Sequence, residues 1–111
     1  MNPPVLIQPI AERFPAREEQ EVVLTLFAPM AKDVQVAGTF NGWRPEATRL
    51  ARSESGEWEV TLRLRSGRYE YRFVIDGVWT DDVRAMERVP NGLGEFNSVV
   101  QVGLDDRTDL L

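Results

Sequence analysis

The chain has 111 residues, a net charge of −5, and neither cysteine nor histidine. This length predicts one domain that can bury its own core. The missing residue types exclude disulfides, thiolate metal sites and thiol nucleophiles, together with the commonest general base and zinc ligand. The acidic balance argues against a nucleic-acid partner, and we expect no metal and no cofactor.

Both ends of the chain differ from its middle. Residues 1–20 lack regular alternation and are predicted to form a lead-in segment, and residues 104–111 form an acidic tail. The start shows neither the basic and apolar regions of a signal peptide nor the apolar length that spans a membrane. We therefore expect a cytoplasmic protein with no membrane partner, whose folded domain occupies residues 21–103.

Within the predicted domain, apolar and polar residues alternate with a period of two. This alternation predicts strands with one face toward a core and one face toward water. No stretch of ten or more residues shows a helical period. The predicted strands are Glu21–Phe27, Asp33–Gly38, Glu57–Leu64, Arg68–Ile75 and Asn97–Val102.

Turn signals separate these strands at short intervals. Gly56, Gly67, Gly77 and Gly92 each follow a Ser, Asp or Asn. Asp76-Gly77 lies between two apolar runs, which predicts a two-residue hairpin. The spacing is typical of an all-β protein, and we predict an immunoglobulin-like antiparallel β-sandwich of about seven strands.

The three tryptophans occupy different kinds of position. Trp58 is in phase with the apolar face of its strand and is predicted to be core. Trp43 and Trp79 follow turns instead. Either they fold back over the end of the core, as large aromatic residues often do, or they form exposed platforms. An exposed indole can stack on the C–H face of a sugar ring at low entropic cost.

Sugar hydroxyls also need directional hydrogen-bond partners, and two polar residues could supply them. Arg72 lies on the strand face opposite Tyr71 and Phe73, and Asn97 begins the last predicted strand. The alternatives are a solvated arginine and an asparagine that bonds to its own backbone. The pattern alone leaves both alternatives open.

Three motifs in order carry a resemblance to a known family: "FAPMAKDVQVAGTFNGW", "RYEYRFVIDGVWTDD" and "NGLGEFNSVVQV". Over residues 21–103 the chain resembles the glycogen-binding domain of AMP-activated protein kinase β subunits and, more broadly, the family 48 carbohydrate-binding modules with their early-set fold. The resemblance implies that two tryptophans, a basic residue, a loop leucine and an amide bind the sugar. Those positions are Trp43 and Trp79 as platforms, with Arg72, Leu93 and Asn97.

Two positions depart from the family's pattern. Arg72 stands where lysine is typical, so its planar fork can change which hydroxyls are contacted. Glu95 stands where a small hydroxyl residue is typical. Glu95 either accepts a hydrogen bond from the sugar or crowds the site, and we include it among the predicted carbohydrate-binding residues.

The resemblance implies non-catalytic binding of an α-1,4-glucan such as glycogen, a maltooligosaccharide or a cyclodextrin. The alternative is an early-set spacer or interaction domain without sugar binding, associated through its termini with a glycogen-metabolising enzyme or a kinase complex. We predict no enzyme, because the catalytic barrel that often follows such modules needs about 250 residues. The carboxylates of Asp76, Asp81 and Asp82 are explained by turns and a polar loop.

Overall fold

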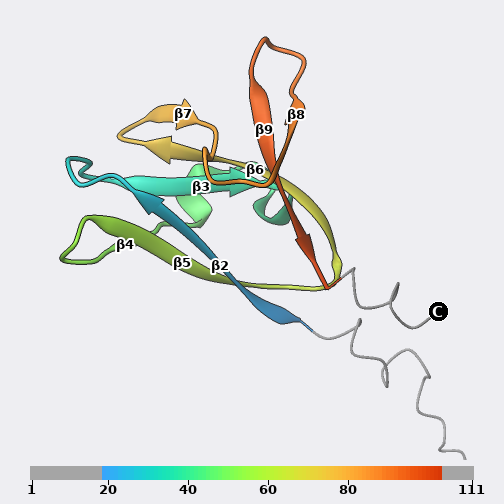
Figure 1. Cartoon of the computed structure of the whole chain (residues 1–111), viewed down its shortest axis with the longest axis horizontal. Helices are drawn as coiled ribbons and strands as arrows, with labels where there is room; N and C mark the ends of the chain where they lie inside the picture. Colours follow the sequence, from blue (N-terminus) through green and yellow to red (C-terminus); the bar gives the residue numbers. More distant parts are fainter. Residues whose placement is uncertain (1–18, 104–111) are drawn as a thin grey trace, which may run out of the picture.

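A computed structural model describes residues 19–103, so nearly all of the predicted lead-in segment and the whole predicted tail, 104–111, lie outside the described residues. The described part is an all-β sandwich of two antiparallel sheets, which confirms the predicted fold class (Figure 1). Its eight strands are β2 (Gln20–Phe27), β3 (Val34–Gly38), β4 (Ala51–Arg52), β5 (Glu57–Leu64), β6 (Gly67–Ile75), β7 (Val78–Thr80), β8 (Glu87–Pro90) and β9 (Phe96–Val102).

The two sheets differ in size and in connectivity. The smaller has the order β2-β5-β4, and the larger has the order β3-β6-β9-β8, with β7 also paired to β6. Strand β6 is shared along one edge: residues 67–71 pair with β9 and residues 73–75 pair with β7. Strand β3 occupies the other edge of β6. As a result, β7 and β9 follow each other along the same side of β6.

Three predicted strands begin one residue earlier in the structure than in the sequence pattern, one begins a residue later, and Glu57–Leu64 is exact. The pattern did not predict β8, the two-residue β4 or two 3₁₀ turns, Thr39–Asn41 and Pro45–Ala47. Strand β8 is four residues long and ends in proline, so its alternation is too short to detect. Its pairing with β9 defines it.

The core lies where the inward faces of the two sheets meet. Trp58 is 6% exposed, and its indole Nε1 donates to the Ala28 carbonyl at 2.8 Å, which confirms its prediction as core. Tyr71 and Phe73 pack edge to face with centroids 5.7 Å apart. The buried cluster consists of Leu24, Leu26, Val34, Val36, Leu50, Trp58, Tyr71 and Phe73.

The sequence analysis explained Asp82 as part of a polar loop after Trp79, but the structure shows that its side chain is buried. The Tyr71 hydroxyl donates to Asp82 Oδ2 at 2.5 Å, and the Asp82 amide donates to Ser98 Oγ at 2.8 Å. Burial, together with this bond to the carboxylate, raises the pKa of Tyr71 well above its usual range. The loop is thereby anchored to β6 and β9 of the larger sheet.

Candidate functional site

The outer face of the larger sheet collects side chains from three neighbouring strands. Tyr71 and Phe73 point into the core, so Arg72 between them points outward. Trp79 pairs with Val74, the next outward position on β6. Asn97 precedes Ser98, which pairs with Tyr71, and it therefore faces outward too. Alternation and register together bring an arginine, a tryptophan and an amide to one face.

Trp43 reaches the same face from a loop that Asn41 holds in place. The Trp43 amide donates to the Gly38 carbonyl at 2.9 Å. Trp43 itself has a φ of 60°, directly after Gly42 at 69°. This left-handed conformation costs a residue other than glycine about 1–2 kcal/mol, so surrounding bonds have to maintain it.

The Asn41 side chain makes four of those bonds. Its Oδ1 accepts from the amides of Gly38 and Arg44, at 3.0 and 3.2 Å. Its Nδ2 donates to the Val36 carbonyl and to Thr48 Oγ1, both at 3.0 Å. The loop is therefore tied to β3 at one end and to the following turn at the other.

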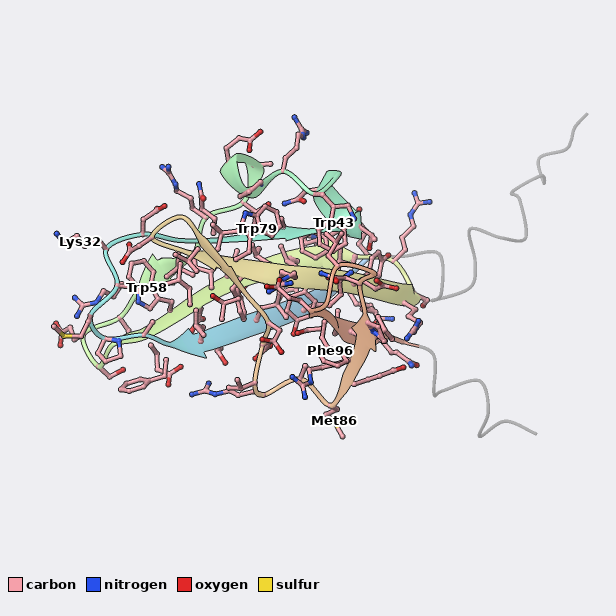
Figure 2. All side chains as sticks on the ribbon, turned by 90° about the horizontal axis from the view of Figure 1, so that it is seen from above. Lys32, Trp43, Trp58, Trp79, Met86 and Phe96 are labelled. Carbon is pink, nitrogen blue, oxygen red and sulfur yellow. The ribbon has the colours of Figure 1, made fainter. Side chains whose placement is uncertain are left out.

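These elements enclose a shallow pocket of about 410 Å³. It brings together all six residues predicted from the sequence, and Asn91 with them. Figure 2 shows Trp43 and Trp79 on the same side of the molecule, and Met86 on the opposite side. Trp79 is 43% exposed. The pocket is lined by Trp43, Arg72, Trp79, Asn91, Leu93, Glu95 and Asn97.

The hairpin of β8 and β9 supplies one wall of the pocket and projects from the body of the sheet (Figure 1). Asn91 closes its tip: the Asn91 amide donates to the Glu95 carbonyl at 2.9 Å, and its Oδ1 accepts from the amides of Leu93 and Glu95, at 2.8 and 3.2 Å. Leu93 is 84% exposed at this tip. A fixed loop thus presents an apolar side chain to water.

The polar side chains of the pocket are already hydrogen-bonded within the protein. Arg72 is only 6% exposed, and its Nη1 donates to Glu95 Oε1 at 2.6 Å. Asn97 Nδ2 donates to Glu70 Oε1 at 3.0 Å. Both alternatives left open by the sequence are therefore excluded, because Arg72 is not solvated and the Asn97 amide bonds to a side chain.

Asn91 is the pocket residue that the sequence analysis did not select. The pair Asn91-Gly92 was interpreted only as a turn. An asparagine that begins a turn commonly accepts bonds from amides a few residues further along, which places its side chain inside the loop. That turn chemistry was the available signal.

The site offers stacking surfaces and hydrogen bonds. Within residues 19–103, no group of three or more His, Cys, Asp or Glu side chains is arranged to hold a metal ion. Over the same residues, no helix has the length and apolar character needed to cross a membrane.

Comparison with known proteins gives one family. The model of the glycogen recognition site of AMP-activated protein kinase matches residues 23–108. Protein FLOURY ENDOSPERM 6 of Oryza sativa subsp. japonica is 40% identical over 67 residues, which are 60% of this chain and 12% of that protein. AMP-activated protein kinase subunit beta-1 of Rattus norvegicus is 35% identical over 75 residues, 68% of this chain and 26% of that subunit.

A third relative is an enzyme. Phosphoglucan phosphatase DSP4 of Castanea sativa is 32% identical over 88 residues, which are 79% of this chain and 23% of the phosphatase. In all three relatives, the match to this chain covers about a quarter of the relative's length or less.

Proposed function

Because this chain belongs to the family of the glycogen recognition site of AMP-activated protein kinase, we propose that it binds α-1,4-glucan in the pocket between Trp43 and Trp79 without catalysing a reaction. The observation that carries this proposal is the convergence of two indoles on one outward-facing pocket. Sites of this kind pair apolar surface with a few polar groups that fix orientation.

Each part of the pocket has a role in this proposal. The indoles of Trp43 and Trp79 stack on the C–H faces of successive glucose rings. Leu93, at the hairpin tip, presses against the apolar side of the curved glucan. Asn97 offers its Oδ1 and the second N–H of its Nδ2 to sugar hydroxyls, since one N–H of this amide already donates to Glu70.

The relatives support a glucan as the ligand class. One is named a phosphoglucan phosphatase, and the matching family model is a glycogen recognition site. Because the match covers only a fraction of each relative, the rest of the phosphatase has room for its catalytic part. We therefore assign recognition, rather than catalysis, to the segment that this chain shares with them.

Binding through two stacks and a few hydrogen bonds is expected to be weak. The pocket is shallow, and association must first offset lost translational freedom and the ordering of the glucan. We expect dissociation constants of about micromolar to millimolar, or roughly −4 to −8 kcal/mol.

Calorimetric titration with maltoheptaose and β-cyclodextrin tests the proposal. Trp43→Ala and Trp79→Ala should each remove measurable binding, because each deletes a stacking surface, while near-native circular dichroism shows that the fold persists. Phe27→Ala is the matched control: Phe27 is 53% exposed, but it lies on β2 of the other sheet. Binding by both tryptophan variants at wild-type strength would overturn the assignment.

A further inference from the structure

Arg72 and Glu95 differ sharply in what they expose to a ligand. The Arg72 side chain is 7% exposed, and that of Glu95 is 60% exposed. They are joined by one contact, from Arg72 Nη1 to Glu95 Oε1 at 2.6 Å. Both residues line the pocket, but Glu95 presents far more of its side chain to an entering molecule than Arg72 does.

We propose that Glu95, and not Arg72, makes the sugar contact on this side of the pocket, by accepting a hydrogen bond from a glucan hydroxyl. Arg72 is a positioning residue that holds the carboxylate from below. This inference rests on the proposed glucan-binding function, and it gives to Glu95 the sugar contact that the resemblance implies for Arg72.

The carboxylate keeps a free acceptor when it is paired with Arg72. The ion pair uses Oε1, and Oε2 has no hydrogen-bond partner among residues 19–103. An ionised carboxylate only accepts hydrogen bonds, so its partner must be a sugar O–H that donates. Such bonds to a charged oxygen are shorter and stronger than neutral ones.

Arg72 is poorly placed to make the contact itself. Its Nε is buried and has no hydrogen-bond partner in the described part of the chain. A guanidinium that left Glu95 to reach a sugar would give up the one counter-ion that it has among the described residues, and a buried charge without its partner is costly. The pair is therefore expected to stay intact when the glucan binds.

The backbone also fixes Glu95 before the ligand arrives. Its amide donates to Asn91 Oδ1 at 3.2 Å, and its carbonyl accepts from the Asn91 amide at 2.9 Å. A side chain held at both its backbone and its carboxylate loses little freedom on binding, which favours affinity.

Fluorinated sugars show whether a sugar hydroxyl donates a hydrogen bond to the protein or accepts one from it. A fluorine in place of a hydroxyl cannot donate a hydrogen bond. We would titrate the wild-type chain and Glu95→Ala with maltotriose and with maltotriosides that carry a single fluorine at the 2-, 3- or 6-position. For the wild type, we expect one fluorinated position to weaken binding about tenfold, as for loss of one charge-assisted bond.

In Glu95→Ala, maltotriose itself should bind about tenfold more weakly, and that fluorine should cause no further loss. The inference would be overturned if the wild-type chain bound every fluorinated maltotrioside as tightly as maltotriose. It would also be overturned if the fluorine weakened binding to Glu95→Ala as much as to the wild type. Absence of any maltoheptaose binding by the wild type would instead overturn the proposed function, and this inference with it.

A double-mutant cycle tests the positioning role of Arg72. Arg72→Met should weaken maltotriose binding severalfold in the presence of Glu95 and cause no further loss in Glu95→Ala. Arg72→Lys should restore most of the affinity, because a single bond from a cation suffices to hold Oε1. Equal losses from Arg72→Met in both backgrounds would show direct contact or general damage, and would overturn the positioning role.

Discussion

The placement of the large Trp43 side chain depends on the small polar side chain of Asn41. Its four hydrogen bonds connect β3, the first 3₁₀ turn and Thr48, and they hold the loop in which Trp43 adopts a positive φ. An asparagine fits because it is both acceptor and donor and is short enough to bond to nearby backbone.

Asn41→Ala should lower the free energy of unfolding by about 2–4 kcal/mol, because four bonds of modest net value are lost together. Glucan binding should also fall, since the Trp43 loop loses its support. Urea denaturation measures the first effect, and calorimetry measures the second.

Asn41→Asp is the matched control, because it keeps the acceptor for Gly38 and Arg44 but loses the donor to Val36 and Thr48. An intermediate loss of stability is expected for this variant. Equal stability of Asn41→Ala and the wild type would contradict the role assigned to the side chain.

At the scale of single elements, the arrangement around β6 explains why a site exists on this sheet. Because β7 and β9 share one edge of β6, Trp79 lies diagonally next to Arg72, and Asn97 lies across from it, one step beyond the pair of Tyr71 and Ser98. The β8–β9 hairpin then extends past the sheet and carries Leu93 and Glu95 to the same pocket. One central strand thus organises residues that lie far apart in the sequence.

The tip of this hairpin should matter more for binding than for stability. Asn91→Ala removes the acceptor for the amides of Leu93 and Glu95, so the loop samples more conformations and glucan binding should weaken about three- to tenfold. The melting temperature should change little, because the tip is exposed. Calorimetry and thermal unfolding measure the two effects.

Asn91→Asp keeps the Oδ1 acceptor and should retain most of the affinity. If Asn91→Ala bound maltoheptaose as tightly as the wild type, the loop would not need this side chain to hold its shape.

At the scale of the whole molecule, Tyr71, Asp82 and Ser98 connect the loop after β7 to the core. The Tyr71 hydroxyl can donate to Asp82 only while it is protonated, and burial keeps it so by raising its pKa. The folded state therefore holds this proton more tightly than the unfolded state does, and stability depends on pH through this group.

Below about pH 10, the ordinary pKa of tyrosine, both states keep the proton and the contribution of Tyr71 is fully present. Above that pH the unfolded chain ionises first, so the free energy of unfolding should fall as pH rises. Urea unfolding at intervals from pH 8 to pH 11 measures this decline.

Tyr71→Phe should abolish most of the decline, although it starts from a lower stability because the bond to Asp82 is lost. Tyr69→Phe is the control, since the Tyr69 hydroxyl donates to the exposed Arg65 carbonyl, and it should keep the decline. A decline of the same size in Tyr71→Phe would mean that another group carries the pH dependence.

Much of the fold could be predicted from the sequence because its signals are local. Alternation with a period of two predicted the five long strands to within one residue at both ends, and Asp76-Gly77 marks a hairpin because both residues tolerate a positive φ. Trp58 was assigned to the core from its phase within β5 alone. These features depend only on residues that are close together in the sequence.

Other features depend on residues that meet only in three dimensions. Strand β8 is defined by its pairing with β9, and Asp82 is buried because Tyr71 and Ser98 lie across from it. The convergence on one pocket needs the register of β6 with β7 and β9. The Arg72–Glu95 pair depends on how the hairpin closes, and its partners are 23 positions apart in the sequence.

Residue types, their spacing and the family resemblance were enough to propose two indoles and a few polar groups as a sugar site. They could not show which polar atoms are already occupied inside the protein, because hydrogen bonds and burial are set by long-range packing. In the folded chain the buried guanidinium of Arg72 is paired with the exposed carboxylate of Glu95. One N–H of the Asn97 side chain already donates to Glu70.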